Sequence, residues 1–252
     1  MKYKNIALTS IVVIIIVALL IGYFCFASLS ASFGYDKGGN KDKATGTESS
    51  VPVTVIIDAG HGGMDSGAVA NGLIEKDLNL EVATKLKSFL TLSGANVIMT
   101  RSEDVLLGDG ETIRMQKISD LKKRLEILNS TDNCLFVSIH MNKFSSSSAH
   151  GLQVFYASAS EEARTLAEVI QEHSKSIDKT NTRQIKPDDK TIYILENTTK
   201  AAVLVECGFL SNSTDASMLA TDEYKDKLAF VIYCGIIEFL WENKDENTVH
   251  MQ

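Results

Sequence analysis

Proline and cysteine are scarce in this sequence, with two prolines and four cysteines among 252 residues. These numbers exclude a proline-rich linker protein and a disulfide scaffold. Basic residues are also in the minority, because 25 Lys and Arg face 32 Asp and Glu and leave a net charge of −7. A chain of this charge does not favour nucleic acid or an anionic membrane surface as its partner. We therefore expect no nucleic acid partner, and a ligand that is neutral, zwitterionic or positively charged.

A long uncharged stretch runs from Asn5 to Tyr35. As a helix, residues 6–27 would span about 33 Å, which is enough to cross a hydrocarbon core of roughly 30 Å. We therefore predict a signal anchor over residues 1–30, a transmembrane helix with the lysines before it inside the cell and the body of the protein outside. Cleavage near the small residues 28–30 is the alternative, and it would export the protein.

The rest of the chain divides into three segments. Residues 31–50 are rich in Ser, Gly, Lys and Asp and lack apolar periodicity, which is typical of a flexible tether. A single folded domain is predicted over residues 51–243, and residues 244–252 form a polar tail. With the anchor retained, the domain lies on the extracytoplasmic face of the cell membrane.

Short apolar runs alternate with helix-length amphipathic segments along the domain. This pattern predicts an α/β fold whose sheet is mostly parallel and covered by helices on both faces. The expected strands are residues 53–57, 95–100, 135–139, 151–156, 192–195 and 203–205. The expected helices are residues 75–92, 112–128, 161–177 and 224–241.

Polar residues appear abruptly at the ends of three predicted strands, where α/β proteins bind their ligands. The three motifs are Asp58-Ala59-Gly60-His61-Gly62-Gly63, Ser138-Ile139-His140-Met141-Asn142 and Leu204-Val205-Glu206-Cys207-Gly208. Together with Glu75 at the start of the first helix, His61 and His140 form a set of two histidines and one carboxylate that suits catalytic zinc. Glu206 then remains available as the base that activates water.

These residues also have simpler interpretations. Glu75 is an acid in a first helical turn, where it would complement the helix dipole. The glycines of the first motif suggest a phosphate-binding loop, but their spacing matches neither the Walker motif nor the dinucleotide fingerprint. Glu206 is harder to explain otherwise, because a carboxylate at the end of a buried strand is costly unless it is paired or bound to a metal.

The successive motifs resemble those of the zinc-dependent N-acetylmuramoyl-L-alanine amidases, the cell-wall family also called amidase type 3. The matching segments are residues 57–68, 75–80, 100–101, 138–142 and 204–212, and the resemblance covers roughly residues 53–240. It implies a twisted, mostly parallel six-stranded sheet with one Zn²⁺ per chain held by His61, Glu75 and His140, and Glu206 as the catalytic acid and base. The implied reaction is hydrolysis of the amide bond between N-acetylmuramic acid and L-alanine in peptidoglycan.

Some residues depart from the family pattern, and these departures concern substrate contacts rather than the metal. Ala59 stands where the family usually has proline, and Met141-Asn142-Lys143 replaces the small-residue ending that usually follows the second histidine. We expect Asn142 to contact the substrate. Arg183 and Lys186 resemble a basic segment of relatives and are predicted to hold a carboxylate of the peptide stem, although they also fit a merely charged surface.

The short, anchored chain resembles the germination-specific amidases of endospore formers, which strip peptide from cortex glycan so that muramic-δ-lactam forms. A role in the vegetative wall is the alternative within the family. Outside the amidase activity, the alternatives are a zinc metallopeptidase or deacetylase acting on another wall amide, and a catalytically silent peptidoglycan-binding homologue. Because the domain leaves no room for a separate wall-binding module, we also expect a protein partner that activates or targets the enzyme.

Overall fold

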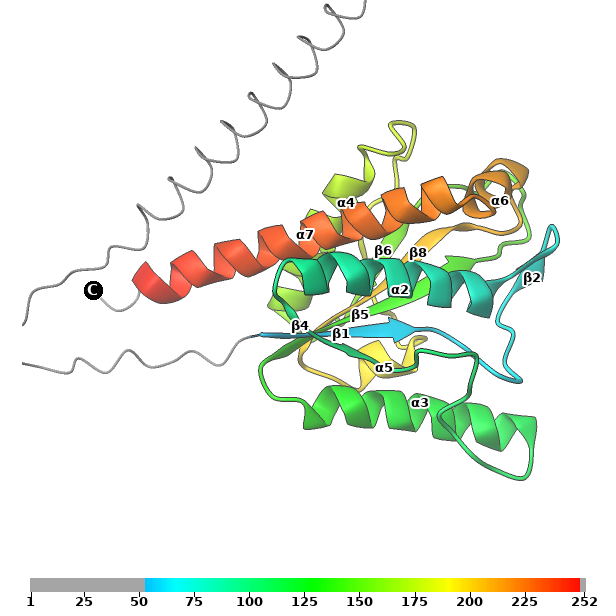
Figure 1. The fold of residues 1–252 in the computed structure, drawn as a ribbon, viewed down its shortest axis with the longest axis horizontal. Coiled ribbons are helices and arrows are strands. Elements are labelled where there is room, and N and C mark those ends of the chain that lie inside the picture. Colours follow the sequence, from blue (N-terminus) through cyan, green and yellow to red (C-terminus); the bar gives the residue numbers. More distant parts are fainter. Residues whose placement is uncertain (1–52, 250–252) are drawn as a thin grey trace, which may run out of the picture. The chain divides into compact units, whose positions relative to one another are not determined.

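The structure, a computed structural model, describes residues 53–249 (Figure 1). The predicted signal anchor and tether lie outside the described residues, as does the end of the predicted polar tail. Within the described part of the chain, no helix combines the length and the apolar character needed to cross a membrane.

Six strands form one sheet in the order β4-β1-β5-β8-β6-β7. Its first four strands are parallel, whereas β6 runs antiparallel to β8 and carries β7 parallel to itself at the edge. A separate hairpin, β2-β3, lies between β1 and α2 in the chain. The strands are β1 (Thr54–Ala59), β2 (Val69–Ala70), β3 (Leu73–Ile74), β4 (Asn96–Met99), β5 (Cys134–Asn142), β6 (Gln153–Tyr156), β7 (Lys186–Pro187) and β8 (Ala201–Phe209).

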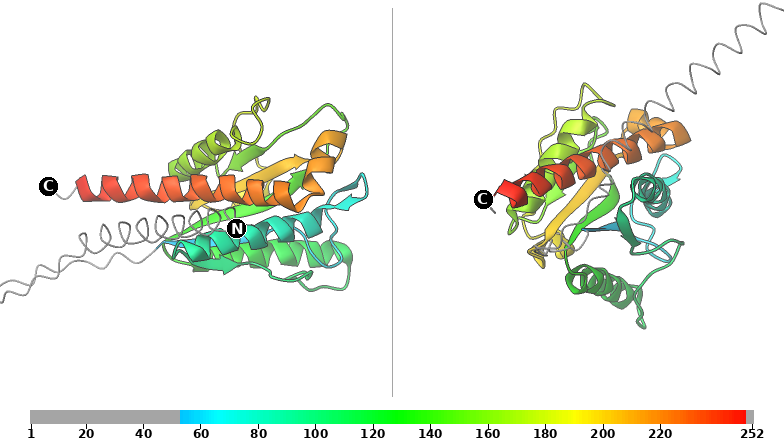
Figure 2. Two further views of the ribbon diagram at one scale, coloured as in Figure 1. Left: turned by 45° about the horizontal axis from the view of Figure 1, so that its top comes forward. Right: turned by 60° about the vertical axis from the view of Figure 1, so that its left-hand side comes forward.

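Helices cover both faces of the sheet. Figures 1 and 2 show α2, α4 and α7 on one face and α3 with the short α5 on the other. The helices of the described residues are α2 (Glu75–Leu92), α3 (Ile113–Ser130), α4 (Glu161–Ser174), α5 (Tyr193–Glu196), α6 (Ser213–Leu219) and α7 (Asp222–Val249).

Two apolar clusters form the core, one on each face of the sheet. Alternation along β1 directs Val55 and Ile57 into the larger cluster, with α2, α4 and α7, and Ile56 into the smaller cluster, with α3 and α5. All six residues of β1 are buried. Burial on both faces explains why the strands read as uninterrupted apolar runs rather than as alternating ones.

The predicted α/β fold with a mostly parallel sheet is confirmed, but the strand predicted over residues 192–195 is wrong. Those residues lie in and beside the helix α5. The backbone N–H groups of Thr191 and Ile192 donate to Oδ1 of Asp188 at 3.2 and 2.9 Å, so the chain turns there instead of extending. A short apolar run is compatible with a strand or a buried helical turn, and periodicity does not separate the two.

Three short elements are missing from the predicted set: the hairpin β2-β3, the edge strand β7 and the helix α6. Each has seven residues or fewer, which is too short to show a period. The closing helix α7 also continues to Val249, beyond its predicted end at residue 241.

Candidate metal centre

Two histidines and one glutamate meet at the carboxyl edge of the parallel strands. His61 lies in the loop after β1, Glu75 is the first residue of α2, and His140 lies near the end of β5. Oε1 of Glu75 is 3.2 Å from Nε2 of His61 and 2.9 Å from Nδ1 of His140. One ligand atom from each residue lies within 4.8 Å of the others. The structure therefore brings together the three residues predicted to bind the metal.

Two glycines allow the histidine rings to approach this closely. A Cβ atom at Gly60 would lie 2.2 Å from Nε2 of His140. At Gly67, which has a φ of +63°, a Cβ atom would lie 2.5 Å from Oε2 of Glu75 and 2.7 Å from the ring of His61. His61 itself has a φ of +62°, a left-handed conformation that is rare for a residue with a side chain. The loop is therefore shaped around His61, Glu75 and His140.

The hairpin β2-β3 returns the chain to the site, where backbone groups of two neighbouring segments fix the side chain of Glu75. The backbone N–H of Ala68 donates to Oε2 of Glu75 at 2.6 Å, and that of Met141 donates to Oε1 at 3.2 Å. Glu75 is 4% exposed, so it is not a solvated acid that merely complements a helix dipole. Both oxygens of its carboxylate are oriented by the backbone.

The ionisable groups at the centre stabilise one another. Burial alone would raise the pKa of Glu75, but the hydrogen bonds and charges of His140 and His61 outweigh it and hold the pKa well below its usual range. Burial would lower the pKa of His61, but Asp65 and Glu75 outweigh it and raise the pKa to about 9. The carboxylate of Glu75 and the imidazole of His61 thus each favour the charged form of the other.

The residues present fit a catalytic zinc site. Two imidazole nitrogens and one carboxylate, without thiolate, are the ligands of zinc in sites that leave a position open for water. The remaining ring nitrogen of His61, Nδ1, lies 2.8 Å from Oδ2 of Asp65. A carboxylate in this position fixes the tautomer and orientation of a metal-binding histidine.

Glu206 lies beside the centre on the neighbouring strand. In the pairing of β5 with β8, His140 is directly opposite Glu206, and the register shifts immediately afterwards. Oε2 of Glu206 is buried and has no hydrogen-bond partner among the described residues. Burial, with a smaller contribution from the charge of Glu75, raises the pKa of Glu206 to about 7. The buried carboxyl group therefore holds a proton more readily than an exposed glutamate does.

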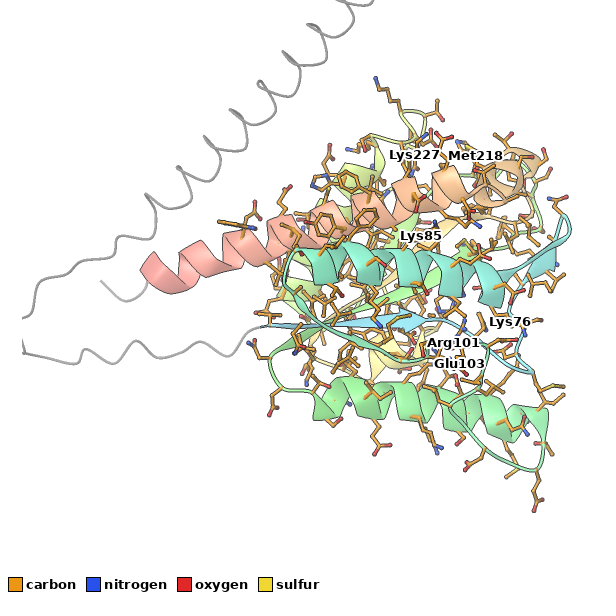
Figure 3. All side chains as sticks on the ribbon, in the orientation of Figure 1. Lys76, Lys85, Arg101, Glu103, Met218 and Lys227 are labelled. Carbon is orange, nitrogen blue, oxygen red and sulfur yellow. The ribbon has the colours of Figure 1, made fainter. Side chains whose placement is uncertain are left out.

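Two buried arginines hold the loop that carries His61. Nη2 of Arg124 donates to the carbonyl of His61 at 2.8 Å, and its Nη1 donates to the carbonyl of Ala59 at 2.8 Å. Arg101 donates through Nε to the same Ala59 carbonyl at 2.8 Å and through Nη2 to the carbonyl of Gly60 at 3.0 Å. Figure 3 shows Arg101 beside Lys76, whose backbone carbonyl it also contacts at 2.7 Å. Three consecutive carbonyls before the glycine-rich turn are thus fixed by guanidinium groups.

Arg124 is held in turn by two buried carboxylates. It forms ion pairs with Asp58 and, at 2.6 Å, with Asp120. Burial would raise the pKa of Asp58, but the charge of Arg124 and hydrogen bonds from Ser138 and Thr100 outweigh it and hold the pKa below its usual range. This network links α3 to Asp58, near the end of β1, and to the loop that carries His61.

The residues predicted to contact the substrate lie around this edge but do not form one cluster. Arg183 and Lys186 line a groove of about 350 Å³ together with Gln153. Asn142 ends β5, and its carbonyl accepts a hydrogen bond from the backbone N–H of Leu210 at 2.8 Å. The groove adjoins the centre, because Gln153 is directly opposite Glu206 in the pairing of β6 with β8.

Sequence reasoning missed Asp65, Arg101 and Arg124 as residues that support the site. Asp65 had a detectable signal, since it lies four residues after His61 in the glycine-rich loop. Arg101 lies in the matching segment 100–101, although that segment indicated no role for it. Arg124 gave no signal, because it belongs to a helix with an unremarkable charge pattern and reaches the loop only through the tertiary fold.

A mostly parallel sheet that carries a two-histidine, one-carboxylate centre and a separate carboxyl group at its carboxyl edge is typical of metal-dependent hydrolases. The comparison with known families is more specific. The family model of N-acetylmuramoyl-L-alanine amidases matches residues 55–238, and the chain belongs to this family. It is therefore an enzyme of the N-acetylmuramoyl-L-alanine amidase class that acts on the cell wall, as the sequence motifs predicted.

Individual relatives agree with this assignment. The chain is 38% identical over 193 residues to the germination-specific N-acetylmuramoyl-L-alanine amidase of Bacillus subtilis, covering 76% of this chain and 81% of that protein. It is 35% identical to the amidase LytC of the same organism over 74% of this chain and 35% of LytC. Among solved structures, the CwlD amidase of Clostridioides difficile, in complex with the GerS lipoprotein, superposes with a TM-score of 0.72 and 41% identity. That match covers 75% of this chain and 98% of CwlD.

Proposed function

We propose that this chain uses one Zn²⁺, held by His61, Glu75 and His140, to hydrolyse the amide bond between the lactyl group of N-acetylmuramic acid and L-alanine. Glu206 acts as the general base and then as the general acid. The observation that carries this proposal is the unpartnered Oε2 of Glu206, in a carboxyl group directly opposite His140. An unsatisfied buried carboxyl oxygen costs free energy, so its presence beside a metal centre favours a catalytic role.

Zinc at this centre would supply Lewis-acid chemistry, polarising the scissile carbonyl and acidifying the attacking water. Glu206 removes a proton from that water and delivers it to the nitrogen of the leaving L-alanine. Burial raises the pKa of Glu206 above its usual value, which helps the carboxyl group to hold the proton between its acceptance and its donation. Asp65 fixes Nδ1 of His61 and leaves Nε2 directed toward Glu75. No covalent bond between enzyme and substrate is needed.

Arg183 is well placed to bind the carboxylate of the peptide stem. Its guanidinium lies 4.3 Å from the ring centre of Phe209, and it donates to the carbonyl of His150 at 2.6 Å and to Oε1 of Gln153 at 3.0 Å. A guanidinium held in this way loses little side-chain freedom on binding a carboxylate. Lys186 adds a second positive charge to the same groove. We keep Asn142, two residues after His140, as a polar contact to the stem.

The biological role that we propose is maturation of the spore cortex, in which peptide removal precedes formation of muramic-δ-lactam. The similarity to the germination-specific amidase and to CwlD supports this role. The enzyme works on the extracytoplasmic face of the membrane, held there by the anchor predicted over residues 1–30, or is exported if that segment is cleaved. Deletion of the gene should give spores whose cortex lacks muramic-δ-lactam, whereas normal lactam content would point to the vegetative wall.

We also propose that a protein partner controls the enzyme by docking on the domain and raising its zinc affinity or completing its substrate groove. The complex of the similar CwlD with a lipoprotein supports the existence of such a partner. Glu75 is a suitable point of control, because it begins a helix whose position a docked protein would influence. The zinc affinity of the full chain should then rise when the partner is added.

Mass spectrometry of purified peptidoglycan after digestion by the full chain tests the reaction. Free peptide stems beginning with L-alanine, together with peptide-free glycan, are the expected products. Cleavage between amino acids would identify a peptidase, and loss of acetyl groups would identify a deacetylase. The variant Glu206→Gln should release stems far more slowly than the wild type while keeping its zinc. The matched variant Glu168→Gln, on the exposed surface of α4, should behave like the wild type.

A further inference from the structure

A second cavity adjoins the metal centre on the face of the sheet covered by α3 and α5. Its volume is about 220 Å³, and it reaches Gly60 and His140 at one end. Mostly apolar side chains line it, among them Leu121, Phe136 and Ile194. This cavity therefore differs in chemistry from the basic groove near Arg183.

Apolar side chains at the mouth of the cavity are partly exposed. Leu121 of α3 is 39% exposed, and Tyr193 of α5 is 37% exposed. The same side of α3 is buried further along the helix, where Leu128 is fully enclosed. Toward the catalytic edge, apolar surface of α3 is thus left open to solvent beside an aromatic ring. Such a surface is typical of a ligand site rather than of a core.

The position of Glu206 indicates on which side of the catalytic edge the peptide stem lies and on which side the acyl half of the substrate lies. The group that protonates the leaving amine must contact the nitrogen of L-alanine, so the peptide stem extends away from Glu206. Across the sheet, Glu206 has Gln153 on one side and His140 on the other. Gln153 accepts a hydrogen bond from Arg183 at 3.0 Å, which places the basic groove on the side of β6. The acyl half of the substrate must then extend toward His140 and Gly60.

We propose that the cavity between α3 and α5 binds the muramoyl half of the substrate, with the ring of Tyr193 packed against the sugar and an N-acetyl or lactyl methyl group inside. This assignment rests on the proposed amidase function. Its volume lies below the 300–1,000 Å³ or so of typical ligand pockets, so it suits the substituents of one sugar rather than a length of glycan.

The charges in the two sites support the same orientation. The charged side chains that line the cavity are Asp58 and Arg124, and they are paired with each other. No net charge is therefore left there to bind a carboxylate of the stem. The groove near Arg183 and Lys186 is positively charged instead. By this difference in charge, the neutral sugar would favour the cavity and the anionic peptide would favour the basic groove.

The test compares two substrates that share the scissile bond: N-acetylmuramoyl-L-alanyl-D-isoglutamine, and the corresponding lactoyl peptide without the sugar. The wild-type full chain, loaded with zinc, should prefer the first in kcat/KM by about tenfold or more. Tyr193→Ala and Leu121→Trp, which remove the ring and block the mouth, should bring this ratio close to one. Tyr193→Phe keeps the ring and should keep the preference. Phe230→Ala, an exposed aromatic residue on α7, is the control for a distant change.

A wild type that cuts both peptides equally well would overturn the proposal, and so would variants that slow both reactions in parallel. Binding of N-acetylmuramic acid alone, followed by saturation-transfer NMR, keeps the proposal testable without turnover. Binding that Tyr193→Ala abolishes, in a chain that cuts neither peptide nor peptidoglycan, would support the cavity while refuting the amidase function. Absence of such binding, or binding that Tyr193→Ala leaves intact, would refute the cavity as the sugar site.

Discussion

Replacing Arg124 by methionine should destabilise the domain strongly, although the residue contacts no substrate. Its side chain is 2% exposed and is paired with Asp58 and Asp120. Methionine has a similar length and an apolar character, so Arg124→Met leaves little cavity but removes the charge. The two carboxylates then lose their buried cation, and the carbonyl of His61 loses its donor.

The size of the effect follows from this environment. Removing one member of a buried ion pair costs about 3–5 kcal/mol, because the remaining charge stays buried without a partner. Folded domains have total stabilities of about 5–15 kcal/mol, so Arg124→Met should remove a large share of the free energy of unfolding. With a urea m-value near 3 kcal/mol/M, the unfolding midpoint should fall by about 1 to 2 M.

The effect should also depend on pH. In the wild type, the pKa of Asp58 is held below its usual value, so its contribution is present above that value and is lost as the pH falls through the folded pKa. In Arg124→Met, burial without a cation raises the pKa of Asp58 above its value in the unfolded chain. The free energy of unfolding of this variant therefore falls as the pH rises and Asp58 has to ionise. The difference in stability between the two proteins should therefore widen from about pH 4 to pH 7.

Urea unfolding of the zinc-free proteins, followed by circular dichroism at several pH values, measures both effects. Arg164→Met is the matched control, because Arg164 forms its ion pairs with Glu161 and Glu168 on the exposed surface of α4. Arg164→Met should change the free energy of unfolding by no more than about 1 kcal/mol. If Arg124→Met lies within 1 kcal/mol of this control, or if its deficit is constant with pH, the argument for the buried network is refuted.

Three further predictions concern the metal centre directly. The wild type should contain about one zinc per chain by elemental analysis and His140→Ala almost none, and full occupancy in that variant would exclude His140 as a ligand. Glu206→Gln should keep its zinc while the rate of stem release falls by roughly 10²- to 10⁴-fold. Glu75→Gln should instead lose zinc first. Loss of metal in both variants would contradict the separate roles of base and ligand. Asp65→Asn should weaken zinc binding by about 10- to 100-fold, because Nδ1 of His61 loses its anionic partner. Competition with a chelator measures this affinity. An unchanged affinity would show that Asp65 does not support His61 as a ligand.

The parts of the site that the sequence predicts are those fixed by strand ends. His61, His140 and Glu206 each follow or end an apolar run. Parallel strands have their carboxyl ends at the same edge of the sheet, and this does not depend on the conformation of the loops. The order of the strands and the burial of the carboxyl group of Glu206 required the structure, since both depend on which strands become neighbours.

Residues that act through tertiary contacts escaped prediction for a physical reason. Arg124 is 63 residues from His61 in the chain, and nothing local marks it as a donor to that carbonyl. The helix α5 was mistaken for a strand because the decisive interaction, acceptance of two backbone N–H groups by Asp188, lies just outside the apolar run. The cavity beside α5 therefore also depends on a feature that periodicity does not reveal.

The reversed direction of β6 has a consequence for protein engineering. Because β6 is antiparallel to β8, the connection from β5 to β6 begins and ends at the catalytic edge without crossing the sheet. Residues 143–148 of this connection are exposed, and exposed loop tips tolerate inserted domains. A ligand-responsive or light-responsive domain inserted there would sit over the entrance to the active site while the strands and the metal centre kept their geometry. This loop is the natural place to build an externally switchable cell-wall hydrolase.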